Sequence, residues 1–256
     1  MILADTHTHL YLEQFDNDRQ ETVKRAMEGG VNYMLLPNID ENTIGPMLSL
    51  AESYPGHIYP MAGLHPTSVK ASYKNQLDII EKELQKGIYC AIGETGIDLY
   101  WDKTYATEQK EALRQQIYMA HAYKLPLVLH SRNALHEIIS LLKDKSLPRT
   151  TGVFHCYPGS VEDAKKITDM GYLLGVGGTV TYKNCQLADV VKYMGLSSIV
   201  LETDAPFLPP VPHRGKRNES LYVQHVAQKV SDILNVPVSE VAQHTTDNAI
   251  RLFGLT

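Results

Sequence analysis

Short apolar segments alternate with longer amphipathic segments from one end of the chain to the other. An apolar run of about four to eight residues between polar or turn residues is typical of a buried strand. Apolar positions three and four residues apart are instead typical of one face of a helix. The pattern predicts eight strands, at residues 2–5, 33–37, 59–62, 90–93, 127–130, 152–155, 172–175 and 199–202.

The clearest helical pattern lies in TYATEQKEALRQQIYMAHAYKLPL. Leu113, Ile117 and Ala120 follow the spacing of one helix face, and Pro126 ends the helix. Two further amphipathic helices are expected in SLYVQHVAQKVSDILNV and in VSEVAQHTTDNAIRLFGL, near the end of the chain. Both are predicted to belong to an outer layer that covers the strands.

Strands that alternate with helices favour a parallel sheet. Eight such units in 256 residues match the length of a (β/α)8 TIM barrel, whereas a doubly wound sheet usually has fewer strands and a glycine-rich phosphate loop. Neither GxGxxG nor GxxxxGK[ST] occurs in the sequence. No linker or low-complexity stretch divides the chain, so residues 1–256 are expected to form one domain.

The composition argues against some classes of protein. A net charge of -5 argues against a protein that holds nucleic acid by its overall charge, so any contact with phosphate would be local. The three cysteines lack CxxC spacing, which favours reduced thiols and a cytoplasmic location. No leader peptide or membrane span is expected, because no apolar run is long enough. Nothing in the sequence indicates an obligate protein partner.

Potential metal ligands follow five of the eight predicted strands. They are His7 and His9 after the first, Glu94 after the fourth, His130 and His155 at the ends of the fifth and sixth, and Asp204 after the eighth. Taken singly, each has an ordinary alternative, as a core histidine or a helix-capping carboxylate. The carboxyl ends of all strands in a barrel meet on one rim, so the six side chains would converge on one pocket. This shared position predicts a metal site.

Six ligands are too many for one tetrahedral zinc ion but suit two divalent ions a few ångströms apart. Glu94 is the expected bridge between the two ions. The expected shells are completed by His7, His9 and Asp204 on one ion and by His130 and His155 on the other. Mixed imidazole and carboxylate ligands favour zinc, manganese or iron over hydrated magnesium, although metal availability in the cell also keeps magnesium as a candidate.

Longer motifs extend this pattern over the whole chain. They are DTHTHL, GLHP, GETGIDLYWD, LPLVLHSRNA, FHCYPGS, LETDAPFLPP, HRGKRN and NAIRLFGL. In their order and spacing the chain resembles the TatD-like metal-dependent hydrolases, a branch of the amidohydrolase-type barrel enzymes. The resemblance implies a TIM barrel and the same six metal ligands. Thr95 and Leu99 depart from the family's more common GEIGLDYY, which bears on substrate preference alone.

Several other residues are candidates for contact with the substrate. Arg132 follows His130 by two residues, and Arg214 lies in the basic loop PHRGKRN. Arginine can donate two parallel charged hydrogen bonds to a phosphate, although a solvated basic loop is the plain alternative. His65, in GLHP, would contact the substrate or a water on the metal, or else stabilise the turn before Pro66.

Three further residues are expected in or near the site. Glu202 precedes Asp204 by two residues, so it shares the same face of the strand and would hold a ligand by a hydrogen bond. Tyr100 and Trp101 follow the Glu94 loop and would either stack on a nucleic acid base or pack beneath that loop.

The expected chemistry is hydrolysis. Two divalent ions lower the pKa of a bound water and polarise the bond under attack. Asp204 would then accept a proton as general base, and Glu94 would hold the ions. The resemblance implies a deoxyribonuclease, with 3′–5′ exonuclease action on single-stranded DNA as one form. The alternatives are hydrolysis of a small phosphoester, amide or lactone, and a noncatalytic metal- or nucleic-acid-binding barrel.

Overall fold

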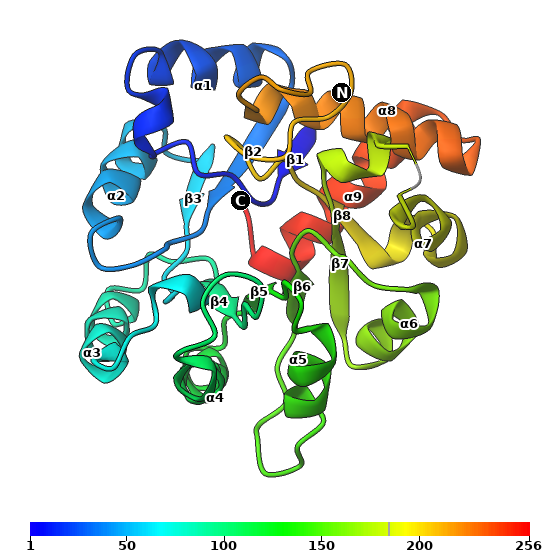
Figure 1. Ribbon diagram of the computed structural model, residues 1–256. Coiled ribbons are helices and arrows are strands. Elements are labelled where there is room, and N and C mark those ends of the chain that lie inside the picture. The colour runs from blue at the N-terminus through cyan, green and yellow to red at the C-terminus, as the bar shows by residue number, and fades with distance from the viewer. Residues whose placement is uncertain (184) are drawn as a thin grey trace.

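The computed structural model describes residues 1–183 and 185–256 and contains parallel strands that alternate with helices (Figure 1). The strands are β1 (Leu3–Asp5), β2 (Val31–Leu36), β3 (Ile58–Pro60), β4 (Ile92–Gly96), β5 (Leu127–His130), β6 (Gly152–Phe154), β7 (Tyr172–Val176) and β8 (Ile199–Leu201). The predicted (β/α)8 barrel is therefore confirmed. All eight predicted strands are present, and the fourth, expected at residues 90–93, differs most in its bounds.

The helices are α1 (Arg19–Glu28), α2 (Ile44–Ser53), α3 (Tyr73–Leu84), α4 (Ala106–Tyr123), α5 (Leu135–Leu142), α6 (Val161–Asp169), α7 (Leu187–Met194), α8 (Val223–Leu234) and α9 (Val238–Phe253). Helices α1 to α8 form a ring around the strands, and α9 lies behind the strands in this view (Figure 1). Short 3-10 turns are η1 (Glu13–Phe15), η2 (Pro66–Ser68), η3 (Gly178–Thr181), η4 (Leu196–Ser198) and η5 (Ser220–Tyr222). No helix in the described parts of the chain combines the length and the apolar character that a bilayer crossing needs.

The strands pair in sequence order, all in parallel. Continuous ladders join β1 to β3 and β4 to β8. Single bridges connect the two ladders, one between Ala62 and Ile92 and the other between Thr8 and Ala205. The second bridge closes the barrel between its first and last strands, and the backbone N–H of Thr6 donates to the carbonyl of Leu201 beside it at 3.0 Å.

Two apolar layers follow from the alternation of side chains along each strand. Leu3 and Leu129 belong to the outer layer, between the strands and the helices. Ala4 and Val128, their neighbours in sequence, belong to an inner layer that fills the barrel. The interior is therefore a packed core, and the open space of the site must lie at one end of it.

The last helix differs from its prediction. α8 packs on α7 and α9 in the outer layer, as expected. The end of α9 instead reaches the inner layer, where Ala249, Phe253 and Leu255 pack with the interior residues of the strands. Ala249 and Phe253 are four residues apart, so they share the face that turns toward the barrel. These three residues define what we call the closed end.

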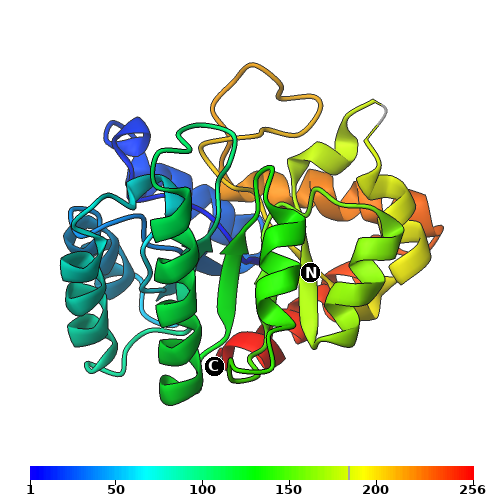
Figure 2. The same cartoon turned by 60° about the horizontal axis from the view of Figure 1, so that its bottom comes forward.

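The loops that follow the strands rise at the opposite end of the barrel from α9. In Figure 2 the loops after β4, β7 and β8 stand at the top, and α9 lies at the bottom. The carboxyl ends of the strands, where the predicted ligands occur, face these loops. We call this end the metal-bearing end.

Candidate metal centre

The register of β5 and β6 places two predicted ligands directly above the barrel interior. His130 and His155 follow the interior residues Val128 and Val153 by two positions, so they point to the same side of their strands. The layer of metal-binding side chains therefore lies on top of the inner apolar layer.

His7 and His9 are held by the segment that closes the barrel. Between them, Thr8 pairs with Ala205, and the backbone N–H of His9 donates to the carbonyl of Ala205 at 2.7 Å. The two Nε2 atoms lie 3.2 Å apart. Two nitrogens that bind one ion at about 2.0–2.1 Å in a tetrahedral arrangement are separated by about 3.4 Å. The histidine pair therefore fits a shared metal ion.

Glu94 lies at the centre of the cluster and is almost completely buried. Its Oε2 faces the Nε2 atoms of His7 and His9 at 3.2 and 3.7 Å. Its Oε1 faces Nδ1 of His130 at 2.9 Å and Nε2 of His65 at 3.4 Å. One carboxylate thus offers a separate oxygen to each of two histidine groups, which is the arrangement that a bridging ligand requires.

Asp204 closes the cluster from the end of β8. Its Oδ1 lies 3.6 to 3.8 Å from the Nε2 atoms of His7, His9 and His155. The residue has a φ of 60°, in the left-handed region that aspartate tolerates better than most side chains. Its backbone N–H donates to the carbonyl of His7 at 2.8 Å, which ties the end of β8 to the first ligand.

His155 lies between the two expected shells. Its ring is stacked on that of His7 with 3.5 Å between the centroids, and its Nε2 lies 3.9 Å from Oε1 of Glu94, the oxygen that also faces His130. Ligand atoms of His65, Glu94 and His130 form a neighbouring group. The expected division of the ligands, with His130 and His155 on one ion, stays a prediction.

Local charges keep the two carboxylates ionised. Burial alone would raise the pKa of Glu94, but the imidazoles of His65 and His7 outweigh it and hold that pKa well below its usual value. The pKa of Asp204 is also lowered, because His155 outweighs the effect of burial. Burial lowers the pKa of His7. Burial would also lower the pKa of His155, but Glu202 and Asp204 outweigh it and raise that pKa to about 10. Neutral imidazoles bind metal ions, so a cation that binds His155 has to displace a proton.

Asp98 is a site residue that the sequence analysis missed. Its Oδ2 lies 2.8 Å from Nε2 of His130, whose Nδ1 faces Glu94. Burial would lower the pKa of His130, but its contacts with these two carboxylates raise that pKa to about 9. A cation that binds His130 therefore has to displace a proton. The signal was present in GETGIDLYWD, where Asp98 follows Glu94 by four residues.

Tyr11 is a second missed residue. Its hydroxyl donates to the carbonyl of Pro37 at 2.6 Å, so its oxygen is left to accept from Nδ1 of His9, 2.9 Å away. A proton on Nδ1 leaves the lone pair of His9 on Nε2, which faces the cluster. Tyr11 therefore sets the tautomer of this ligand, and its place two residues after His9 was the only sequence signal.

Glu202 lies beside His155, within ion-pair distance of its ring. Its Oε1 lies 3.1 Å from Nδ1 of His155 and accepts the backbone N–H of Cys156 at 2.6 Å. The carboxylate occupies space that a glycine leaves on β7, since a Cβ on Gly175 would lie 2.5 Å from Oε2 of Glu202. This close approach explains why β7 carries a glycine where neighbouring strands carry larger residues.

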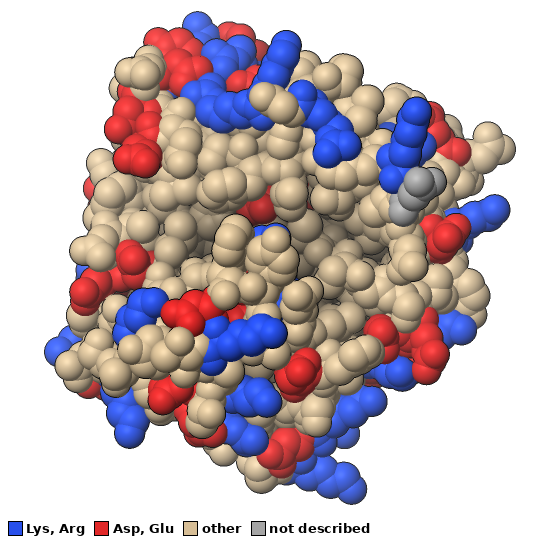
Figure 3. Space-filling view, viewed as in Figure 1, with Lys and Arg blue, Asp and Glu red and all other residues tan. Residues whose placement is uncertain are grey.

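A cavity of about 530 Å³ opens above the cluster. Figure 3 shows the hollow near the centre of this face, with acidic residues visible inside it. His65 and Arg132, two of the predicted substrate-binding residues, line the cavity together with the metal-binding side chains. The cavity is thus open to a small ligand or to the end of a chain.

Arg214 is not among the described residues that line this cavity. Its guanidinium lies 4.3 Å from the centroid of the Tyr182 ring. Arg217 of the same loop is paired with Asp18, with its Nη1 2.6 Å from Oδ1. Arg217 is therefore engaged by its own protein, and the predicted contact of Arg214 with the substrate stays a prediction.

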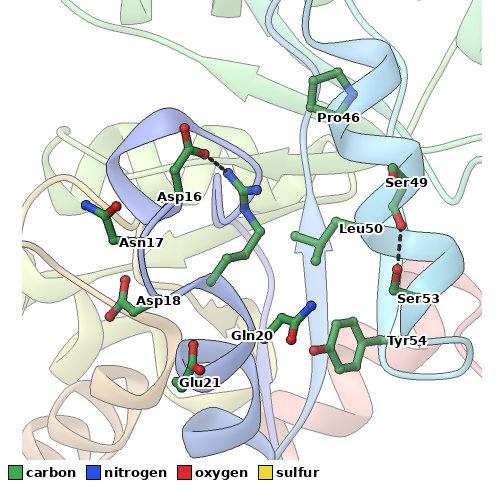
Figure 4. A pocket seen from close by; sticks show the side chains of 11 residues that line it. Asp16, Asn17, Asp18, Gln20, Glu21, Pro46, Ser49, Leu50, Ser53 and Tyr54 are labelled. Atoms are coloured by element: carbon green, nitrogen blue, oxygen red, sulfur yellow. Dashed lines mark hydrogen bonds and ion pairs between the residues drawn. The ribbon is translucent and has the colours of Figure 1, made fainter.

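A second cavity, of about 720 Å³, lies between α1 and α2 (Figure 4). Among the described residues that line it there is no histidine or cysteine. Its charged groups partly neutralise each other, because Arg19 forms an ion pair with Asp16. This cavity offers no donor set comparable with that of the metal-bearing end.

The side chains of the metal-bearing end fit a divalent cation. Ligand atoms within 4.8 Å of one another occur in four overlapping groups: His7, His9 and Glu94; His7, His155 and Asp204; His65, Glu94 and His130; and His155, Cys156 and Glu202. Imidazole nitrogens and carboxylate oxygens together suit zinc, manganese or iron. His7, Glu94 and His155 are each shared between two groups, which places the groups side by side.

Comparison with known proteins identifies a family that this chain matches. Residues 4–254 match the family model described as TatD related DNase. The chain is 37% identical to the uncharacterized metal-dependent hydrolase YabD of Bacillus subtilis, over 99% of this chain and 100% of that protein. It is also similar to the crystal structure of YjjV, a TatD homologue from Escherichia coli, with a TM-score of 0.92, 32% identity and coverage of 99% and 98%.

The names of these relatives are also informative about metal binding. Their names as metal-dependent hydrolases and the histidine and carboxylate groups of this chain together indicate divalent metal binding. The match extends over nearly all of the chain, including every residue of the cluster. The chain therefore belongs to the TatD family of metal-dependent hydrolases.

Proposed function

We propose that this protein is a deoxyribonuclease that hydrolyses phosphodiester bonds at the end of single-stranded DNA, using two divalent ions. The observation that carries the proposal is the position of Glu94, whose two oxygens face two different histidine groups. The description of the matching family as related to DNases supports the choice of DNA as substrate.

Individual residues would have distinct roles in the proposed reaction. Divalent ions in this centre would lower the pKa of a water and polarise the phosphorus–oxygen bond under attack. Asp204 would accept the proton of that water, because its carboxylate is held ionised and lines the cavity. Arg132 lines the same cavity and would orient a phosphate by charged hydrogen bonds.

The shape and charge of the site support an end of a single strand over the middle of a duplex. The cavity holds about 530 Å³ and is surrounded by loops, so it accepts a terminal nucleotide more readily than a rigid double helix. The net charge of -5 opposes broad binding of a polyanion. Recognition would therefore depend on a few contacts close to the metal centre.

A second candidate function is hydrolysis of a small uncharged ester, amide or lactone. The position of Arg214 favours it, because this arginine is not among the described residues that line the cavity, and Arg132 is the one lysine or arginine among them. The same metal-activated water attacks carbonyl and phosphoryl centres alike. Only an assay with both substrate classes separates the two candidates.

The test compares substrates and metals on one preparation. Protein stripped of metal and then loaded with manganese, zinc or magnesium is incubated with end-labelled single-stranded and duplex oligonucleotides and with a simple ester and lactone. We expect metal-dependent shortening of the single strand from one end. Glu94→Gln should abolish it, and Glu83→Gln on α3, whose carboxylate pairs with Lys86, should not. Intact oligonucleotides beside a hydrolysed ester would overturn the proposal.

A further inference from the structure

We propose that Tyr100, Trp101 and Arg132 form a platform on which the terminal nucleobase of the DNA strand stacks while its phosphate lies at the metal centre. We call these three residues the aromatic shelf. The inference rests on the proposed deoxyribonuclease function and adds a base-binding subsite to it. The sequence left two roles open for the aromatic pair, stacking on a ligand or packing beneath a loop, and the structure distinguishes them.

The aromatic rings of the shelf are exposed. Trp101 has 66% of its surface accessible and Tyr100 has 50%, so neither packs beneath the loop after β4. Large aromatic side chains gain free energy when they are removed from water, and neighbouring exposed rings are a feature of binding surfaces. Trp101 also lines the metal cavity, so this exposed surface is continuous with the reaction site.

The shelf is fixed in place by the same residue that contacts a metal ligand. Oδ1 of Asp98 accepts the backbone N–H groups of Tyr100 and Trp101 at 2.9 and 3.1 Å. Oδ2 of Asp98 faces Nε2 of His130 at 2.8 Å. One buried carboxylate therefore holds both the metal-binding imidazole and the backbone of the shelf, so the distance between base and phosphate subsites is defined by the fold.

Arg132 completes the shelf from the end of β5. Its guanidinium carbon lies 3.9 Å from the centroid of the Tyr100 ring and 5.1 Å from that of Trp101. A guanidinium that lies over an aromatic face keeps its N–H edges available for a phosphate. The two rings are perpendicular, with 4.9 Å between their centroids. The shelf thus places the exposed ring of Trp101 beside a positive charge.

The opposite wall of the cavity is also apolar. Phe207 and Leu208 line the cavity from the loop after β8 and are partly exposed. β8 and β4 are four strands apart in a ring of eight, so their loops lie on opposite sides of the mouth. A ligand with a planar aromatic group would therefore meet apolar surface on both sides. Together with a phosphate, this describes a nucleotide at the end of a strand.

The experiment uses the fact that Trp101 is the only tryptophan in the chain. Metal-loaded protein is titrated with a single-stranded oligonucleotide whose terminal linkage is a cleavage-resistant phosphorothioate, and intrinsic tryptophan fluorescence is recorded. A matched oligonucleotide has an abasic terminal position. We expect quenching by the first oligonucleotide and little or none by the second.

Variants extend the test to turnover. Trp101→Ala should raise KM for base-bearing DNA about 10-fold with little change in kcat, because stacking acts on binding, and should leave KM for the abasic strand unchanged. Trp101→Phe should retain most of the affinity. The matched control is Tyr193→Ala, which removes an equally exposed ring with a lysine, Lys165, over its face at 4.2 Å but far in sequence from the site. It should change nothing.

The outcomes separate this inference from the proposed function. Cleavage of DNA without a fluorescence change, or equal quenching by base-bearing and abasic strands, would overturn the shelf and leave the deoxyribonuclease standing. Quenching by the base-bearing strand alone, in a protein that cleaves only esters, would support the shelf and overturn the nuclease. An equal rise in KM for both strands in Trp101→Ala would also count against stacking.

Discussion

The two ends of the barrel are built from the same strands but serve opposite purposes. At the metal-bearing end the side chains that point inward are buried histidines and carboxylates that lie close to one another. At the closed end, Ala249 and Phe253 of the last helix and Leu255 just after it pack with alanine, leucine and valine of the strands. The comparison shows that the fold derives its stability from one end and holds its chemistry at the other, as barrel enzymes generally do.

The closed end also affects the chemistry. Val128 and Val153 lie one inward position below His130 and His155, so the metal-binding layer rests on apolar side chains. Charges act on each other more strongly in such surroundings than in water. The lowered pKa of Glu94 is one result, because the imidazoles near it outweigh the cost of its burial. The apolar layer is thus part of what makes the ligands above it effective.

The largest expected effect comes from Glu94→Gln at the metal-bearing end. We expect hydrolase activity to fall by about 1,000-fold or more, because the change removes a central metal ligand. Metal at 100 times its dissociation constant should stabilise the wild-type protein by about 2.7 kcal/mol and the variant by much less. Urea unfolding with and without manganese measures this. An unchanged metal-dependent increment would show that Glu94 does not hold an ion.

Phe253→Ala should destabilise the protein at the closed end without changing the metal-binding side chains. Removal of a buried phenylalanine costs about 3–5 kcal/mol, so the free energy of unfolding should fall by that amount. The metal-dependent increment and the activity per folded molecule should remain those of the wild type, because Phe253 is not among the metal-binding side chains. Urea unfolding and an assay at a temperature where the variant is folded test both points. A loss of kcat would show that the ends are coupled.

Much of this architecture was predictable from the sequence, because it depends on periodicity. The eight strands are short apolar runs, and the ligands directly follow them, so barrel geometry brings the ligands together. The place of α9 was not predictable in this way. An amphipathic helix shows that it has an apolar face, but Phe253 could pack on the outside of the strands or beneath the barrel with the same pattern.

The details of the site depended on side-chain directions that a pattern does not contain. Asp98 and Tyr11 contact ligands through single hydrogen bonds, and residues of these types are common in loops. Arg214 was expected at the substrate because of its charge, but it lies on Tyr182 and is not among the described residues that line the cavity, and Arg217 of the same loop is paired with Asp18. Contacts within the protein compete with contacts to a ligand, and only the three-dimensional structure shows which of them are made.

The smallest expected effect concerns the basic loop above the metal-bearing end, which Arg217 anchors to Asp18. The hydrogen bond with Arg217 is the main reason that the pKa of Asp18 is lowered from 3.8 to about 2. The pair is partly exposed, so screening reduces its value, and Asp18→Asn should lower the free energy of unfolding by about 1 kcal/mol at neutral pH. This stabilisation is present above a pH of 3.8 and is lost as the pH falls through about 2. In urea unfolding, the difference in stability between the wild type and Asp18→Asn should therefore become smaller as the pH falls through that interval. If Arg217 instead served only to bind substrate, Asp18→Asn would change KM and leave the free energy of unfolding unchanged.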